Sequence, residues 1–399
     1  MIPIANAFEI IDRETPLLGI ESVAISELCG RVLTEDIVAD SDLPPFDRSQ
    51  MDGYAVVAAD TENAPVELRI VGESAAGRGW RGKVVSGDAV RIMTGAPVPD
   101  GADAVQKLEL TAESETGSSV QIAEPTKPGR YIIAKGAETA AGTKIFASGE
   151  LVTASMIASV AAFGYSNVRV GVRPKVAVLS TGSEIVPIDQ TPQQDQIRNS
   201  NSPMIAALVR ESGGTSIEHP LAADDVDGLT SAIGNAAAGS DILVITGGVS
   251  VGKYDLTKDV LRSLGAEIFF ERVRLKPGKP AVFARLGKTL VFGLPGNPVS
   301  AAVTFHLFVR RAMRKMQGAA ELGLRPGFAI AAKKAKGTAE RDTFLPAAIG
   351  TDDTGRAVAV PLKWLGSSDF IGFSRADALI FVPAGTTYEA GDVVGTFLI

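Results

Sequence analysis

Between residues 241 and 300 of this chain, Lys276, Lys279, Asp255 and several glycines have types and spacing suited to binding phosphate. Lys276 and Lys279 flank the Pro-Gly turn of KPGKP, which fixes their directions, and the apolar segment AVFA follows. Lysines in turns are commonly only solvated, but ammonium groups beside a buried strand are well suited to contact phosphate oxygens. The segment therefore predicts a crevice for a phosphorylated ligand, to which Asp255 of the preceding loop would contribute a carboxylate.

Glycine-rich loops follow two apolar segments that are expected to be strands. STGSE follows KVAVL, and TGGVSVG, which holds Gly247, Gly248 and Ser250, follows DILVI. In an open α/β sheet, ligands bind at the carboxyl ends of strands, where glycine N–H groups can close on a phosphate. Each loop alone is equally compatible with a tight turn, whereas the pair favours a ligand site. Neither loop matches the P-loop or the dinucleotide-binding pattern.

Four carboxylates are candidates for holding a metal ion at this crevice: Glu184, Asp224, Asp225 and Asp255. Carboxylate oxygens suit hard cations such as Mg²⁺. The chain has one cysteine and two histidines, which disfavours zinc sites and Ser-His-Asp hydrolysis. The alternative for Asp255 is a helix N-cap, and the alternative for Asp224 and Asp225 is a solvated helix start.

Three further segments combine rigid turns with polar side chains. LPGNP places Pro295 and Pro298 at a strand-to-helix turn, with Asn297 as the expected N-cap of the helix. Upstream, LPPFDRSQMDGYAV carries Asp52, and RIMTGAPVPDGADAV carries Thr94. Proline, glycine and aspartate are typical of turns, so a purely structural role is the alternative for each segment. The length and density of the Asp52 segment exceed what a turn needs.

The composition predicts a multidomain globular protein. The 399 residues exceed one hydrophobic core, and the apolar (45%) and charged (21%) fractions are ordinary. The net charge of −7 argues against a nucleic-acid partner, and no apolar run is long enough to span a membrane. The N-terminus lacks the features of a signal peptide. The single cysteine, Cys29, is expected to be a core residue and fits a cytoplasmic location.

The pattern of apolar runs, turn residues and helical periodicity divides the chain into five segments. Residues 1–46 and 131–172 are expected to be two parts of one strand-and-helix domain, with a helix in the second part. Residues 47–130 alternate short β-branched runs with turns, which predicts an inserted all-β domain. In residues 173–320 strands alternate with helices, which predicts a parallel-sheet α/β domain that ends in a long helix. Residues 326–399 predict a small C-terminal β-barrel or sandwich.

Seven segments, in order, resemble the MoeA/gephyrin family of molybdenum-cofactor proteins: LPPFDRSQMDGYAV, RIMTGAPVPDGAD, VAVLSTGSEI, IRNSNSP, TGGVSVGKYD, LKPGKP and LPGNPVSA. The resemblance covers nearly the whole chain. The first two are specific to the family, whereas the other turns also occur in related molybdopterin-binding domains. The resemblance implies a homodimer with an elongated α+β N-terminal domain, which also serves in dimerisation, and an inserted all-β domain. It further implies a molybdopterin-binding α/β domain and a C-terminal β-barrel-like domain.

The resemblance also implies a molybdopterin molybdenumtransferase. Such an enzyme inserts molybdate into adenylylated molybdopterin, with Mg²⁺-dependent hydrolysis of the adenylate and release of AMP. Contacts with the molybdopterin adenylyltransferase and with molybdoenzymes are a further implication. The implied catalytic residues are Asp52, Thr94, Glu184 and Asp255. The implied substrate-binding residues are Gly247, Gly248, Ser250, Lys276, Lys279, Pro295, Pro298 and Ser367. The implied metal ligands are Glu184, Asp224, Asp225 and Asp255.

The chain departs from the family pattern in one segment. Where the family often has an Arg-Gly-Glu-Asp run, this sequence has KGAET, so that Glu138 takes the usual aspartate position. No role is therefore assigned to Glu138. Two alternative functions stay open: a gephyrin-like scaffold of the same fold, and a CinA-like nucleotide hydrolase. The first is disfavoured because nothing resembles a long linker to a second catalytic domain, and the second because it would not need residues 43–56.

Overall fold

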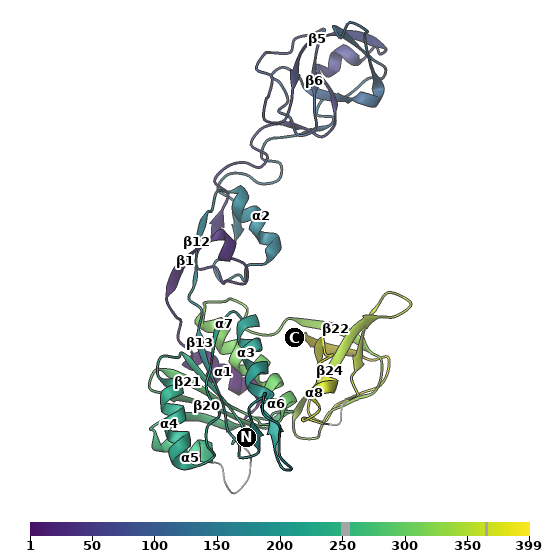
Figure 1. Cartoon of the computed structure of the whole chain (residues 1–399). Helices are drawn as coiled ribbons and strands as arrows, with labels where there is room; N and C mark the ends of the chain where they lie inside the picture. Colours follow the sequence, from purple (N-terminus) through teal and green to yellow (C-terminus); the bar gives the residue numbers. More distant parts are fainter. Residues whose placement is uncertain (249–255, 364–365) are drawn as a thin grey trace. The chain divides into compact units, whose positions relative to one another are not determined.

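The computed structural model describes residues 1–248, 256–363 and 366–399, so that the predicted site residues Ser250 and Asp255 lie outside the described residues. The chain forms two compact units. The larger unit comprises Met1–Glu35, Ser148–Ala154 and Asn167–Ile399, and the smaller comprises Asp36–Ala147 and Ser155–Ser166. The larger unit holds an α/β domain and a C-terminal barrel, and the smaller holds an all-β domain (Figure 1).

A six-stranded sheet forms the centre of the α/β domain. Its strand order is β16 (Thr215–Glu218), β13 (Lys175–Ser180), β17 (Ile242–Thr246), β21 (Thr289–Leu294), β20 (Pro280–Leu286) and β18 (Glu267–Arg272). The first four strands are parallel, as predicted. Every residue of β17 and β21 is buried, which explains why both segments are apolar without alternation.

The sheet is not parallel throughout, contrary to the expectation from the alternating pattern. β20 runs antiparallel to β21, and β18 runs antiparallel to β20. Only Gly287 and Lys288 separate the paired residues Leu286 and Thr289. A loop of two residues can join only antiparallel strands, because a parallel crossover needs a dozen residues or more. Gly287 has a φ of 60°, which this kind of hairpin turn requires.

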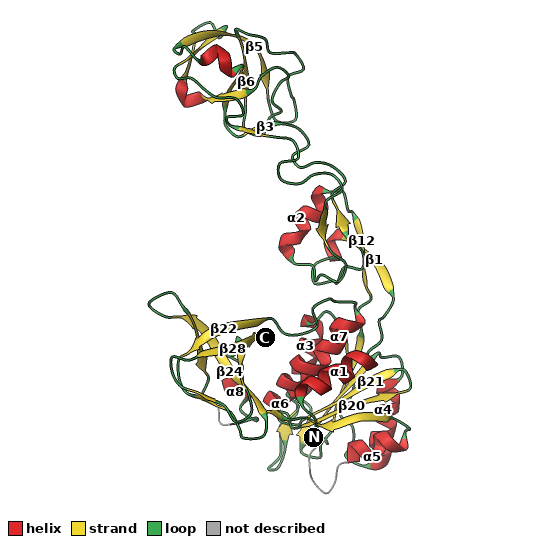
Figure 2. Cartoon of the chain, turned by 180° about the vertical axis from the view of Figure 1, so that it is seen from behind, coloured by secondary structure: helices red, strands yellow, loops and turns green. Residues whose placement is uncertain are grey.

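Helices cover both faces of the sheet, as Figure 2 shows from behind. One face carries α4 (Val226–Ala237) and α5 (Leu256–Ser263), which pack on the residues of one strand face, such as Ala177 and Leu179. The other face packs on Val176 and Val178. Its helices are α1 (Ile4–Glu14), α3 (Asn201–Glu211) and the consecutive segments α6 (Pro298–Thr304), η4 (Phe305–Val309, a π-helix) and α7 (Arg310–Met316). The last three segments are the long helix predicted at the end of this domain.

The C-terminal domain is a closed β-barrel, which confirms the barrel prediction. Its strands are β22 (Pro326–Ala331), β24 (Asp342–Thr351), β25 (Ala357–Pro361), β26 (Ala378–Val382) and β28 (Val393–Leu398), and the pairing of β24 with β26 closes the ring. Minor elements are α8 (Phe370–Phe373), β23 (Ala335–Lys336) and β27 (Thr387–Tyr388). The strand β19 (Leu275–Lys276) adds to β24, so the start of KPGKP is held by the barrel.

The smaller unit is built on a six-stranded sheet, which confirms an all-β inserted domain. The order is β7 (Ala104–Lys107), β4 (Gly53–Val56), β6 (Asp88–Ile92), β5 (Val66–Ser74), β9 (Ser119–Ile122) and β8 (Thr111–Glu113). Short pairs join β2 (Ile37–Val38) to β11 (Lys144–Phe146) and β3 (Arg48–Ser49) to β10 (Ile132–Ile133). The predicted second-segment helix is α2 (Ala154–Ala162). In the larger unit, β1 (Ile20–Ala24) pairs with β12 (Asn167–Gly171).

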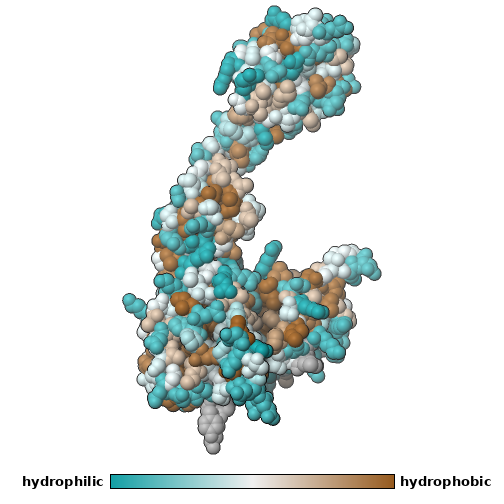
Figure 3. All heavy atoms as spheres, viewed as in Figure 1, coloured by the Kyte–Doolittle hydropathy of each residue, from teal (hydrophilic) through white to brown (hydrophobic). Residues whose placement is uncertain are grey.

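Cys29 is exposed, so the expectation of a core cysteine is wrong. The preceding residue, Leu28, takes the buried position instead, and Gly30 continues the chain with a φ of 78°, so the backbone turns at the cysteine. Hydrophilic residues cover most of the visible surface, with smaller hydrophobic patches between them (Figure 3). Within the described ranges, no helix is both long enough and apolar enough to span a membrane.

Candidate functional site

A cavity of about 640 Å³ lies at the carboxyl ends of β13 and β17. Ser180 and Thr181 come from the end of β13, and Thr246 and Gly247 come from the end of β17. The chain leaves β13 for β16 on one side and later reaches β17 on the other side. This reversal of strand order opens a crevice at which open α/β sheets bind ligands. The predicted pair of strand-end loops therefore meets at one cavity, which is named the crevice site below.

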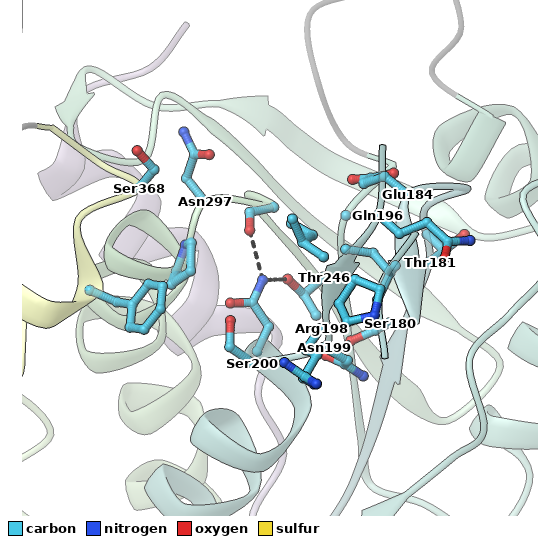
Figure 4. Close-up of a pocket in the computed structure, with 18 residues that line it drawn as sticks. Ser180, Thr181, Glu184, Gln196, Arg198, Asn199, Ser200, Thr246, Asn297 and Ser368 are labelled. Atoms are coloured by element: carbon cyan, nitrogen blue, oxygen red, sulfur yellow. Dashed lines mark hydrogen bonds between the residues drawn. The ribbon is translucent and has the colours of Figure 1, made fainter. Parts of the chain in front are cut away.

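Three residues at the start of α3 line the same cavity: Asn199, the N-cap residue Ser200, and the first helical residue Asn201. Asn199 Oδ1 accepts a hydrogen bond from the backbone N–H of Ser202 at 3.1 Å, which gives one N–H group in the first turn of α3 a partner. Asn201 Nδ2 donates to Thr246 Oγ1 at 2.8 Å and to the carbonyl oxygen of Gly296 at 2.7 Å, the bonds drawn as dashed lines in Figure 4. Asn201 therefore ties the start of α3 to the ends of β17 and β21.

The remaining walls of the crevice site are both polar and apolar. Figure 4 shows Glu184 and Gln196 on one side and Asn297 and Ser368 on the other. Glu184 and Gln196 flank the short paired strands β14 (Ile185–Val186) and β15 (Ile197–Arg198). The apolar lining residues are Ile185, Pro192, Ile197, Pro298 and Phe370. A ligand with a flat apolar body and polar edges matches this lining.

A second cavity, of about 600 Å³, is lined by the two predicted lysines and is named the cation site below. Lys276 and Lys279 share it with Arg341 from the barrel domain, and no acidic residue is among its lining residues in the described chain. The turn between the lysines requires glycine, because Gly278 has a φ of 112° and a Cβ there would lie 2.5 Å from Thr304 Cγ2. Three cations without a lining carboxylate favour an oxyanion.

Asn297 lines both cavities and connects the α/β domain to the barrel domain. It occupies the N-cap position of α6, as predicted, but its side chain does not cap the helix. Its Nδ2 instead donates a hydrogen bond to Ser367 Oγ at 2.7 Å. The expected capping bond is therefore replaced by a contact that fixes Ser367, a predicted substrate-binding residue, at the rim of the cation site.

The structure places the predicted substrate-binding residues in two groups. Gly247 and Pro298 line the crevice site, together with the predicted catalytic residue Glu184. The residues that line the cation site are Lys276, Lys279, Pro295 and Ser367. Gly248 follows Gly247 with a φ of 64°, and a Cβ there would lie 2.4 Å from Thr257 Oγ1. Gly248 is therefore a position where the close packing of the loop demands glycine.

The acidic residues proposed as metal ligands are not assembled by the described part of the chain. Glu184 lines the crevice site, but neither Asp224 nor Asp225 is among its lining residues. Asp225 Oδ1 accepts a hydrogen bond from the backbone N–H of Gly228 at 2.8 Å, so this residue caps α4. No group of three metal-ligating side chains occurs among the described residues. The assignment of these acids to a metal ion stays a prediction.

Asp52 and Thr94 are brought together within the smaller unit. Asp52 Oδ1 accepts hydrogen bonds from the backbone N–H of Thr94 at 2.6 Å and from its hydroxyl at 2.9 Å. The backbone bond, followed by the hydroxyl bond, holds the pKa of Asp52 below its usual value. In the same unit Glu138 forms an ion pair with Arg48 at 2.7 Å, so the residue at the departure from the family pattern has a local structural partner.

Several residues that line the crevice site or the cation site were not predicted from the sequence. Asn199, Ser200 and Asn201 stand in IRNSNSP, where a run of small polar residues directly before a helix is a usable signal. Arg341 and Phe370 carry no such signal, because they reach the cavities from segments of the barrel domain. Only the docking of the barrel on the α/β domain places them there.

The chain matches three family models in sequence order. They are the MoeA N-terminal region (domain I and II) over residues 2–164, the probable molybdopterin binding domain over residues 177–315, and the MoeA C-terminal region (domain IV) over residues 329–398.

Relatives and solved structures match over the full length. A protein of Staphylococcus aureus named molybdopterin molybdenumtransferase is 32% identical over 100% of this chain and 95% of its own length. A protein of the same name from Staphylococcus epidermidis is 32% identical over 94% of this chain and 90% of its own. The crystal structure described as a molybdopterin biosynthesis moeA protein from Pyrococcus horikoshii covers 100% of both chains, with a TM-score of 0.84 and 29% identity. A further crystal structure, described as a molybdopterin biosynthesis moea protein from Pyrococcus horikosii, gives a TM-score of 0.79 and 33% identity, over 100% of this chain and 99% of the other.

Proposed function

This chain belongs to the MoeA family, and from that premise we propose that it is a molybdopterin molybdenumtransferase. The observation that carries the proposal is the pair of adjoining cavities that share Asn297. The crevice site suits adenylylated molybdopterin, because strand-end loops approach phosphate and the apolar walls suit a ring. The cation site suits molybdate, an oxyanion.

The two lysines and Arg341 give the cation site its role in this proposal. Lys276 and Lys279 attract the oxyanion, and the planar guanidinium of Arg341 adds donors in a fixed geometry. Ser367 adds a hydroxyl donor, held by its bond from Asn297. The site would thus hold molybdate beside the dithiolene that receives the molybdenum. Water would then attack the adenylyl phosphorus, the P–O bond to the molybdopterin phosphate would break, and AMP and the molybdenum-loaded cofactor would be released.

Mg²⁺ is a proposed cofactor of the adenylate hydrolysis. Mg²⁺ is usually bound in enzymes through one or two carboxylates together with substrate phosphates, and it keeps several waters. Glu184 in the crevice site fits this pattern, since it supplies one carboxylate beside the proposed phosphate position. When bound, Mg²⁺ would neutralise charge on the phosphate. Asp255 is the proposed second carboxylate.

The remaining parts of the proposal concern partners and location. The enzyme would work as a homodimer in the cytoplasm, receive its substrate from the molybdopterin adenylyltransferase and deliver its product to molybdoenzymes. Relatives that match over nearly their whole length are named transferases. No feature of the described part of the chain favours the scaffold function or the CinA-like function over the transferase function.

The direct test incubates the purified protein with adenylylated molybdopterin, molybdate and Mg²⁺. AMP is measured by chromatography, and cofactor is measured by activation of a cofactor-free molybdoenzyme. We expect both products, with AMP release dependent on Mg²⁺. If neither product forms with protein of confirmed fold, the transferase proposal is wrong and the scaffold alternative gains weight.

A further inference from the structure

A cavity of about 390 Å³ in the smaller unit belongs to neither the crevice site nor the cation site. Three segments line it: Phe46, the loop after β5 with Trp80 and Arg81, and the loop after β6 with Pro97 and Asp100. All of these residues lie within the smaller unit, in which Figure 1 labels β5 and β6. The cavity is named the Trp80 site below.

The Trp80 indole is held in place by its contacts with the fold. A Cβ at Gly72, on β5, would lie 2.2 Å from Trp80 Nε1, and a Cβ at Gly82 would lie 2.3 Å from Trp80 Cζ2. The ring therefore lies directly against two backbone positions that carry no side chain. It also packs against a buried cluster that includes Val84 and Ala96. Since Trp80 lines the cavity as well, it offers a ligand an aromatic surface whose position is already set.

Hydrogen bonds tie the three lining segments to one another. The buried Ser74 hydroxyl donates to the carbonyl oxygen of Pro97 at 2.7 Å and accepts from the backbone N–H of Trp80 at 3.4 Å. The backbone N–H of Val98 donates to the carbonyl oxygen of Asp47 at 2.9 Å, which joins the first segment to the third. The fold itself forms the cavity, so a ligand does not have to order its walls.

The apolar lining of the Trp80 site suits a polyproline II segment. Phe46 is 41% exposed, and Pro97 and Pro99 line the cavity together with Trp80. Grooves lined by aromatic side chains bind such segments, which are already extended and lose little entropy on binding. The carbonyl oxygens of a polyproline II segment have no internal partner. Trp80 Nε1 supplies a donor, because no described residue accepts its hydrogen and it is not an enclosed atom.

Two charges of opposite sign complete the lining. Arg81 and Asp100 are exposed, come from different loops, and form no ion pair with each other or with another described residue. Each can therefore pair with an opposite charge on a ligand. Because one loop carries the positive charge and the other the negative charge, an extended ligand with both charges would bind in one direction.

We propose that the Trp80 site binds an extended, proline-rich segment of a partner protein, with an acidic residue of that segment against Arg81 and a basic residue against Asp100. The prolines of the segment would pack on Trp80 and Phe46. The inference goes beyond the proposed function, because no residue that lines the Trp80 site lines the crevice site or the cation site.

The test titrates blocked synthetic peptides into the full-length protein. Two probes carry the charges in opposite order: acetyl-Arg-Pro-Pro-Pro-Pro-Glu-amide and acetyl-Glu-Pro-Pro-Pro-Pro-Arg-amide. In a matched control of each, glycine and serine replace the prolines, which keeps the charges and makes the chain flexible. By isothermal titration, we expect the favoured proline peptide to bind with a Kd below about 1 mM, roughly tenfold more tightly than its flexible match. It should bind roughly threefold or more tightly than the reversed proline peptide, because exposed charge pairs contribute modestly.

Tryptophan fluorescence locates the binding. The chain has two tryptophans, Trp80 and Trp364, and Trp364 lies outside the described residues. In Trp364→Phe, Trp80 alone emits, and the favoured peptide should shift this emission with the Kd that titration gives. The isothermal measurement on the wild type does not depend on the folding of this variant.

Charge reversal tests the direction of binding. Arg81→Glu with Asp100→Lys should invert the preference between the two proline peptides, since both charges of the site change sign. The matched control, Glu115→Lys with Lys127→Glu, makes the same two reversals at exposed residues of the smaller unit outside the cavity. It should keep the wild-type preference. Circular dichroism melting would confirm that both double variants fold.

Four results would overturn the inference: no saturable binding of either proline peptide, equal binding of the flexible peptides, an unchanged Trp80 emission at saturation, or a preference that keeps its direction after charge reversal at Arg81 and Asp100. The outcome is separable from the test of the proposed function, because AMP release and cofactor formation are measured without any peptide. Failure of either experiment therefore contradicts only its own proposal.

Discussion

Asp52 and Thr94, which lie in two motifs 42 residues apart, form one hydrogen-bonded unit, because Asp52 Oδ1 accepts from both the backbone N–H and the hydroxyl of Thr94. From the sequence, Asp52 and Thr94 were separate catalytic candidates. In the structure, Thr94 supplies both hydrogen-bond donors to the exposed carboxylate of Asp52. The arrangement holds the carboxylate ionised and fixes its direction.

Thr94→Val should raise the pKa of Asp52 without restoring its usual value, because the hydroxyl bond is lost and the backbone bond stays. The pKa of this carboxyl is lowered in the fold, so the two bonds stabilise the protein above about pH 4 and lose that effect as pH falls. Carbon-13 NMR titration of the Asp52 carboxyl measures the shift. Thr111→Val, in the same unit, is the control and should leave the Asp52 titration unchanged. An unchanged pKa in Thr94→Val would contradict the bonded arrangement.

Lys276→Met with Lys279→Met should weaken molybdate binding by tenfold to a hundredfold, the range for charge-assisted hydrogen bonds of roughly 1.5–3 kcal/mol. Wild-type binding should weaken as salt rises, because the screening length falls from about 10 Å at 0.1 M to 3 Å at 1 M. The double variant should lose most of this salt dependence. The control, Lys333→Met with Lys336→Met, makes the same charge change at exposed barrel residues outside the cavity. Equal affinities in both double variants would show that the cation site does not bind molybdate.

Asp225→Ala should lower the free energy of unfolding by about 1 kcal/mol, because the cap of α4 on Gly228 is lost. Asp225→Asn should keep most of this stability, since asparagine caps about as well. If the residue only caps, the Asn variant keeps its dependence on Mg²⁺ in the AMP-release assay. A large rise in the Mg²⁺ concentration required, at unchanged stability to urea, would instead support the predicted role of Asp225 as a metal ligand.

Gly53→Ala should destabilise the smaller unit by roughly 1–3 kcal/mol, as overpacking does. A Cβ at Gly53 would lie 1.9 Å from the backbone oxygen of Gln106 on β7, so the strand pairing of β4 must shift. Gly350→Ala is the matched control, because a Cβ there meets nothing within 4 Å. Urea unfolding of both variants measures the difference. Equal stabilities would mean that β4 and β7 can separate at no cost.

His306 should make the protein sensitive to acid. Burial lowers the pKa of His306 to about 4, against about 6.5 in an unfolded chain. Between these values the unfolded state binds more protons, so stability is full at pH 7 and falls as pH drops towards 4, by roughly 2–3 kcal/mol from this residue. Urea unfolding at pH 7 and pH 4 should show a smaller loss in His306→Gln than in the wild type. The control His219→Gln should lose as much as the wild type, and equal losses in all three proteins would refute the prediction.

Most of the individual helices and strands could be predicted from the sequence, because the periodicity and turn residues that specify each one lie within its own segment. Periodicity and turn residues predicted the parallel strands β13 and β17, the helices α3 and α4, the all-β unit and the C-terminal barrel. The glycines of the strand-end loops and of KPGKP predicted where backbone must turn sharply, and Gly278 bears this out.

The tertiary structure decided what depends on contacts between distant segments. Strand direction at β20 was set by a two-residue hairpin, and the exposure of Cys29 by a turn that buries Leu28 in its place. The cavities are completed by Arg341 and Phe370, which come from another domain, and by the orientation of one amide, Asn201. A sequence determines which groups can form hydrogen bonds, but burial and packing across domains determine which partners they find.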